Sequence, residues 1–136
     1  MREYRLRLDG YGISGDRYKE LLHMCRQYDE MRRRLDRIRA GADEPRPSGG
    51  GARGGVKDPT GSRAARAADS WCAARIHAIE QAAVAADPAV CRFILRNVTR
   101  GVSYDKMAAA ARIPCGRETF YDLRRRFFWL LDQMLV

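Results

Sequence analysis

The chain has 136 residues, of which 26 are Lys or Arg and 17 are Asp or Glu, so its formal net charge is +9 and its isoelectric point is near 9.9. This excess favours a polyanionic partner, because each phosphate contact releases counterions, although an arginine-rich coding background would produce it as well. The sequence holds two isolated histidines, no nucleophile motif and no carboxylate pair at an informative spacing, so we expect neither an enzyme nor a bound cofactor.

The cysteines do not form a metal-binding pattern. They are Cys25, Cys72, Cys91 and Cys115. None lies in a Cys-x-x-Cys pair, and His23 and His77 have no ligand spacing to any of them, so no zinc site is expected. Without a signal peptide or a membrane-length apolar run, we expect reduced thiols, a cytoplasmic protein of a bacterial host cell and no membrane partner.

The N-terminal part, residues 1–40, is predicted to be an arm followed by one helix. Residues 1–13 begin with alternating polar and apolar residues, which fits a short extended arm or simply a chain terminus. Ser14-Gly15-Asp16 is a helix start, and the helix should run to about Ala40. Its apolar positions follow steps of 3, 4, 3, 4 and 3, a heptad seam made by Leu21, Met24, Tyr28, Met31, Leu35 and Ile38.

A seam of this length is marginal for an isolated coiled coil and therefore needs a partner helix. That partner is either a second copy of the chain, giving a homo-oligomer such as a dimer, or another helix of the same chain. The side opposite the seam is basic, with Arg32, Arg33, Arg34, Arg37 and Arg39. This cluster is either a solvated face or a second contact with nucleic acid.

Residues 41–61 are rich in Gly, Pro and Ser and predict a flexible linker. The run lacks the Gly-Lys-Ser/Thr ending of a phosphate-binding loop. Residues 62–136 then predict a helical domain. A helix over 63–86 has a face of mostly small residues, and Asp87-Pro88 should begin a second helix that ends at Gly101. The fold class predicted from the whole chain is all-α.

Residues 103–126 have the pattern of a helix-turn-helix. Ser103 is a suitable N-cap for a short helix, and residues 112–116 contain the Pro and Gly of a turn. The last helix should run from Arg117 to about Leu135. We expect its buried stripe to be Phe120, Leu123, Phe127, Leu130 and Met134.

The N-terminal half of this last helix, residues 117–126, should be the part that enters a DNA major groove. Its side chains, with those of the preceding helix and turn, are types that contact bases and phosphates. The predicted DNA-binding residues are Ser103, Lys106, Arg112, Arg117, Glu118, Thr119, Tyr121, Asp122, Arg124 and Arg125. Phe128 and Trp129 point away from the expected stripe and predict packing against another element or subunit. The alternative is an αα-hairpin that only completes a bundle.

Three segments of the sequence carry a family resemblance. They are Gly101-Val-Ser-Tyr-Asp-Lys-Met, Ile113-Pro114, and Arg117-Glu-Thr-Phe-Tyr-Asp-Leu-Arg-Arg-Arg-Phe-Phe. Over residues 58–131 the chain resembles phage-encoded transcriptional regulators of the ArpU/RinA type, whose C-terminal domain is similar to sigma region 4. The resemblance implies DNA binding through the helix that begins at Arg117.

The sequence thus predicts a sequence-specific DNA-binding regulator of phage or prophage transcription, whose partner is double-stranded DNA. Two alternatives remain open at this level. One is a phage DNA-packaging adaptor like a terminase small subunit, which would assemble as a ring. The other is a phage-encoded interaction module that binds and inhibits a host nucleic-acid machine, so that its partner is a host or phage protein.

Overall fold

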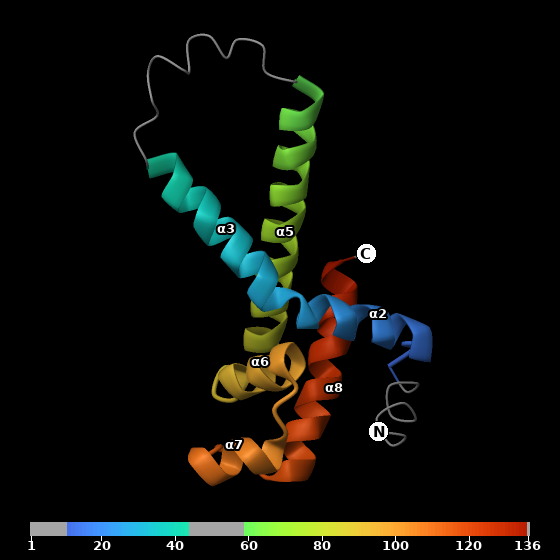
Figure 1. Cartoon of the computed structure of the whole chain (residues 1–136). Coiled ribbons are helices and arrows are strands. Elements are labelled where there is room, and N and C mark those ends of the chain that lie inside the picture. Colours follow the sequence, from blue (N-terminus) through green and yellow to red (C-terminus); the bar gives the residue numbers. More distant parts are fainter. Residues whose placement is uncertain (1–10, 44–58, 136) are drawn as a thin grey trace.

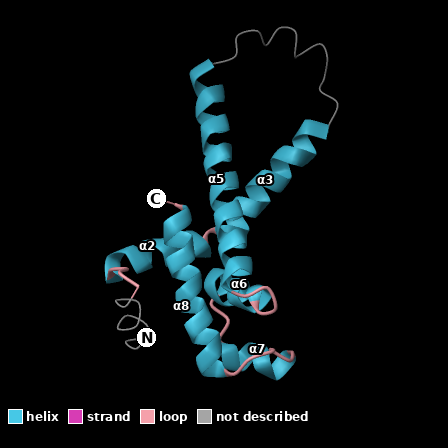
Figure 2. Ribbon diagram, turned by 180° about the vertical axis from the view of Figure 1, so that it is seen from behind, coloured by secondary structure: helices cyan, strands magenta, loops and turns pink. Residues whose placement is uncertain are grey.

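The computed structural model describes residues 11–43 and 59–135, and within these ranges the chain is all α-helix (Figures 1 and 2), which confirms the predicted fold class. The helices are α2 (Gly15–Arg26), α3 (Tyr28–Asp43), α5 (Pro59–Ala86), α6 (Cys91–Arg100), α7 (Tyr104–Ala110) and α8 (Arg117–Met134). None of these helices combines the length and the apolar character needed to cross a membrane.

The expected single helix over residues 14–40 is instead two helices, and this prediction was wrong. α2 starts where the sequence indicated, with the Ser14 hydroxyl accepting a hydrogen bond from the Arg17 N–H at 3.1 Å. It stops at Gln27, whose N–H bonds the Met24 carbonyl at 3.1 Å, and α3 follows. The break lets α2 pack against α6 and α8 while α3 packs against α5.

Most of the seam residues pack within the chain, which is one of the two arrangements that the sequence left open. Leu21 and Met31 are 1% and 4% exposed, and the hydroxyl of Tyr28 donates a hydrogen bond to Glu80 of α5. Met24 and Leu35 are half-buried, and Ile38 is 40% exposed on the part of α3 that diverges from α5 (Figure 1).

The basic cluster of α3 is divided between ion pairs and open surface. Arg34 contacts Asp69 of α5 at 2.7 Å, and Arg32 lies 3.7 Å from Glu80. These pairs fasten α3 to α5. Arg33 and Arg37 are exposed.

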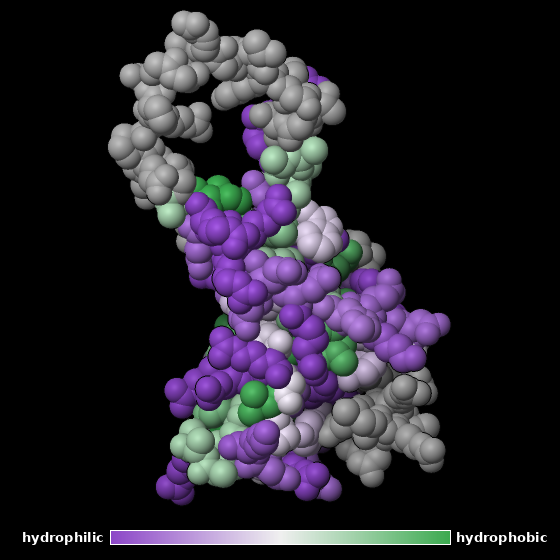
Figure 3. All heavy atoms as spheres, in the orientation of Figure 1, coloured by the Kyte–Doolittle hydropathy of each residue, from purple (hydrophilic) through white to green (hydrophobic). Residues whose placement is uncertain are grey.

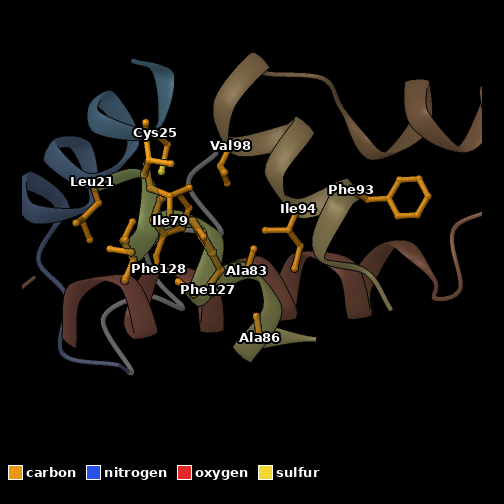
Figure 4. Close-up of a cluster of buried hydrophobic side chains, with 14 of the residues drawn as sticks. Leu21, Cys25, Ile79, Ala83, Ala86, Phe93, Ile94, Val98, Phe127 and Phe128 are labelled. Carbon is orange, nitrogen blue, oxygen red and sulfur yellow. The ribbon is translucent and has the colours of Figure 1, made fainter. Parts of the chain in front are cut away.

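Helix α5 is the central element of the core, and it packs most extensively against α8. Its buried residues include Ile76 and Ile79 and the alanines at 82, 83 and 86. Alanine side chains let two helices approach closely, so the phenylalanines of α8 fill the space between them (Figure 4). The helix begins at Pro59, inside the predicted linker.

Helix α6 begins later than predicted and ends where predicted. The carboxylate of Asp87 accepts hydrogen bonds from the N–H groups of Ala89 and Val90, at 2.8 and 3.3 Å, and closes a turn before the helix starts at Cys91. Gly101 ends the helix with φ of 72°, a left-handed conformation that glycine adopts without strain.

The buried face of α8 differs from the predicted stripe. Phe120, Phe127, Phe128 and Leu131 are fully buried, whereas Met134 is 43% exposed, and Leu123 and Leu130 are half-buried. α8 contacts α5, α2 and α6, so it buries a wide face. Phe128 therefore packs in the core of the same chain, against Tyr18, with ring centroids 5.0 Å apart.

Some predictions fall on residues that the structure does not describe. The N-terminal arm, predicted for residues 1–13, lies mostly outside the described residues, which begin at Tyr11. Of the predicted linker at 41–61, residues 44–58 are also outside them, while its two edges belong to α3 and α5.

Candidate nucleic-acid interface

Helix α7 is fixed at its start by a local capping bond. The hydroxyl of Ser103 accepts a hydrogen bond from the Lys106 N–H at 3.2 Å, and Asp105 places a negative charge in the first turn. Met107 is 2% exposed and anchors the helix to the core. Lys106 and the alanines at 108, 109 and 110 are exposed.

The turn between α7 and α8 is held by two tyrosines. The hydroxyl of Tyr104 donates a hydrogen bond to the Cys115 carbonyl at 2.7 Å. The hydroxyl of Tyr121 accepts a longer one from the Tyr104 N–H at 3.4 Å. These bonds join the first residue of α7 to the end of the turn and to α8, so the two helices keep a fixed relative position. Tyr121 is half-buried and uses its hydroxyl inside the protein.

The first two turns of α8 present a mixed polar surface. Arg117, Glu118, Thr119 and Asp122 are exposed, and Phe120 between them is fully buried against the Tyr104 and Tyr121 rings. A side chain buried at this point fixes the rotation of the helix about its axis. The exposed residues therefore have a defined direction, away from the core.

Arg124 is not on this surface, contrary to the expectation that it contacts DNA. It is 6% exposed, and its guanidinium lies 5.0 Å from the centroid of the Phe128 ring. Its Nε donates to the Asn97 side-chain oxygen at 2.5 Å, and its Nη2 donates to the Tyr18 hydroxyl at 3.1 Å. Asn97 in turn donates to the Val102 carbonyl at 3.0 Å. Arg124 thus connects α8 to α6, α2 and the loop before α7.

Arg125 is also buried, 3% exposed, and forms an ion pair with Asp122 one turn earlier. The expectation that Arg125 lies at the surface is therefore wrong, and its burial speaks against a contact with a base edge. The exposed arginine of the three consecutive ones is Arg126, which the sequence interpretation omitted. Consecutive residues of a helix point about 100° apart, so the three could not share one face.

The exposed charges of the unit over residues 103–126 nearly cancel. The basic ones are Lys106, Arg112, Arg117 and Arg126, and the acidic ones are Asp105, Glu118 and Asp122. Arg117 lies 3.8 Å from Asp105, with both side chains largely exposed. The unit therefore offers varied hydrogen-bonding groups rather than a strong positive potential.

A second set of arginines lies outside the predicted site, on α6. Arg92, Arg96 and Arg100 are spaced four residues apart and all three are exposed. The i, i+4 spacing places them on one face of the helix. The signal was present in the sequence, because residues 91–100 contain these arginines and no acidic residue.

Phe128 and Trp129, which were both predicted to pack against another element or subunit, differ in their exposure. Phe128 is in the core, and Trp129 is 36% exposed, with its ring centroid 6.1 Å from that of Tyr11. Within the described part of the chain, α8 therefore presents only Trp129 of this pair at the surface.

The thiols of Cys25 and Cys115 are poor nucleophiles in their environments. Burial raises the pKa of the Cys25 thiol to about 12, against the opposing charges of Arg124 and Arg26. Burial also raises the pKa of the Cys115 thiol, and the nearby carboxylate of Asp87 adds to the shift. In the described ranges, no three His, Cys, Asp or Glu side chains gather as a metal site would require.

Comparison with known proteins gives no relative from which a role could be transferred: no protein-family model, curated protein or solved structure matches the chain.

Proposed function

We propose that the protein binds double-stranded DNA with sequence preference, through the unit formed by α7, the turn and the N-terminal half of α8. The observation that carries this proposal is the surface of the first two turns of α8. Arg117, Glu118, Thr119 and Asp122 are exposed there, on a helix end whose rotation is fixed by the buried Phe120.

The chemistry of these side chains suits base edges. Arginine donates two hydrogen bonds to guanine, and a carboxylate accepts one from the cytosine amino group. Threonine forms a hydrogen bond with a donor or an acceptor on a base, or contacts the thymine methyl group. The N-terminal residues of a recognition helix are the ones that meet the bases. The near-cancelling charges of this surface support selective contacts rather than general attraction to phosphate.

The shape of the molecule supports the same assignment. α7 and the N-terminal end of α8 lie at the end of the molecule opposite to the diverging arms of α3 and α5 (Figures 1 and 2). An α-helix with its side chains is about 10–12 Å across, and the major groove is about 12 Å wide. A helix end at an extremity of the described part of the protein is well placed to enter the groove.

The biological role that fits this proposal is control of a phage or prophage promoter, as the resemblance to phage-encoded regulators implies. A regulator of this kind acts as a monomer or a dimer, and a dimer would read two half-sites. A packaging adaptor would form a ring of many subunits. The mass of the protein in solution, alone and with DNA, separates these roles.

The test is selection of bound sequences from random duplex DNA, followed by affinity measurements on the selected site and on unrelated DNA. We expect the selected site to be bound at least about a thousandfold more tightly at physiological salt. In the variant Glu118→Gln, the preference at one position should move from cytosine toward adenine, because an amide pairs with the adenine edge.

The matched control is Gln133→Ala, an exposed change near the other end of the same helix. It should leave the selected sequence unchanged. If the protein binds no duplex DNA at low salt, or if selection enriches no sequence, the proposed function is wrong.

A further inference from the structure

Helix α6 has two chemically distinct faces. Phe93, Ile94 and Val98 are buried against the core. Arg92, Arg96 and Arg100 form the α6 arginine row on the exposed side, and no acidic residue of the helix interrupts it. Arg92 and Arg100 are eight residue steps apart, so the row extends about 12 Å along the helix axis.

The position of Arg92 runs against the local preference of a helix. The first turn favours acidic side chains, because the free N–H groups there carry partial positive charge. α6 has no acid in its first turn and has Arg92 there instead. The guanidinium of Arg92 lies 4.7 Å from the centroid of the Phe93 ring, which supports it at the surface. Because the positive charge of Arg92 is unfavourable beside the helix dipole, we infer that this side chain has a role other than stabilising α6.

The row begins beside the turn of the helix-turn-helix. Arg92 and Arg112 line one open hollow of about 440 Å³, whose other lining residues are Pro88, Ala89, Cys91, Phe93 and Pro114. Figure 3 shows hydrophilic residues gathered over the side of the molecule where α6 lies in Figure 1. Arg92 of α6 thus lies beside the same hollow as Arg112, which belongs to the turn that leads into α8.

The row ends at the C-terminus of α6, where another arginine lies close. The Nε of Arg26 donates to the Val98 carbonyl at 3.0 Å. The guanidinium of Arg26 also lies against Gly101, so closely that a Cβ at position 101 would be 2.9 Å from its Nη1. Arg100 pairs with Asp29 at 3.1 Å, with both side chains partly exposed. An exposed pair of this kind is weak and exchanges readily for another anion.

From these observations we infer that Arg92, Arg96 and Arg100, together with Arg112, bind the phosphate backbone of the DNA that α8 reads. The inference rests on the proposed function and adds to it the surface that supplies most of the salt-dependent affinity. One DNA strand presents a charge about every 3.4 Å along the axis, so a row of about 12 Å spans several phosphates. The nearly neutral surface of α8 does not supply this attraction.

The test compares two double variants that remove the same charge. Arg92→Gln with Arg96→Gln removes two residues of the row, and Arg33→Gln with Arg37→Gln removes two exposed arginines of α3. Affinity for the selected site is measured over a salt series. The slope of log affinity against log salt should become shallower by about 1.8 in the α6 variant, because each lost phosphate contact contributes about 0.9.

The affinity of the α6 variant at about 0.1 M salt should fall at least about tenfold, and its preferred sequence should not change. The α3 variant should keep the slope and the affinity of the wild type. Far-ultraviolet circular dichroism and thermal unfolding are the controls for folding. Both variants should be folded, because all four substituted side chains are exposed.

The two levels of the proposal fail differently. If the wild-type protein does not bind DNA, the proposed function fails and the inference fails with it. If the wild type binds a preferred site but the α6 variant keeps the salt slope of the α3 variant, the inference is overturned and the proposed function stands.

Discussion

Helix α6 carries three arginines, and α8 carries three consecutive ones in addition to Arg117. The two helices use these sets of three in opposite ways. On α6 they are spaced four residues apart, and Arg92, Arg96 and Arg100 are all exposed. On α8 they are consecutive, so they point in three directions; Arg124 and Arg125 are 6% and 3% exposed, and Arg126 is open to solvent. Spacing, rather than the number of basic residues, decides how much charge a helix presents.

The same comparison separates structural from surface roles. Arg124 holds three elements of the fold together through Asn97 and Tyr18. The arginines of α6 contribute one exposed ion pair, between Arg100 and Asp29. We therefore expect substitution of the buried Arg124 to act mainly on stability, and substitutions in the α6 arginine row to act mainly on affinity for DNA.

The largest expected effect is that of Arg124→Ala. It removes a buried side chain and leaves the Asn97 side-chain oxygen and the Tyr18 hydroxyl without this donor, so we expect the free energy of unfolding to fall by about 3 kcal/mol. Arg126→Ala is the matched control two residues further along the same helix, and it should change stability by less than about 0.5 kcal/mol. Chemical denaturation monitored by circular dichroism measures both.

Equal losses in these two variants would contradict the buried role of Arg124. An effect of Arg124→Ala on DNA affinity, measured where the variant is fully folded, should be small beside that of the α6 variants.

An intermediate effect is expected from Tyr104→Phe, which removes the hydroxyl that donates to the Cys115 carbonyl. Stability should fall by about 1 kcal/mol, the usual contribution of one partly buried hydrogen bond. Because the bond fixes the turn before α8, the ratio of affinities for the selected site and unrelated DNA should also fall, while the salt slope stays constant. Tyr11→Phe, at a residue 42% exposed, is the control for removing a hydroxyl.

The smallest expected effect on stability is that of Arg100→Gln. Its ion pair with Asp29 is partly exposed, so the loss should be below about 0.5 kcal/mol in a denaturation experiment. A loss above 1 kcal/mol would mean that the fold itself requires this member of the α6 arginine row, and the contrast with α8 would weaken.

Several features of the protein were determined by local sequence signals. The all-α class follows from helical periodicity, and Ser14, Ser103 and Gly101 mark helix ends that the structure confirms. These signals are reliable because a cap bonds the backbone only a few residues away, so no distant element is needed. Phe120 was likewise identified as a core residue from spacing alone.

In the candidate site, local sequence signals predicted the exposure of some residues correctly and of others wrongly. Arg117, Glu118 and Thr119 are exposed, in agreement with the pattern, because the first turn of α8 has few neighbours. Further along, Arg124 and Arg125 were placed at the surface by their polarity. Arg124 is covered in part by α2, whose Tyr18 comes from a segment 106 residues earlier in the chain.

The sequence by itself determined that the chain is helical, where several helices begin and end, and that an exposed polar surface starts α8. Only the tertiary structure decided that the helix over residues 14–40 breaks at Gln27 and that Phe128 packs within the chain. It also decided which arginines face solvent. The physical reason is that the energy of burying a side chain depends on the neighbours that surround it, and these come from distant parts of the chain.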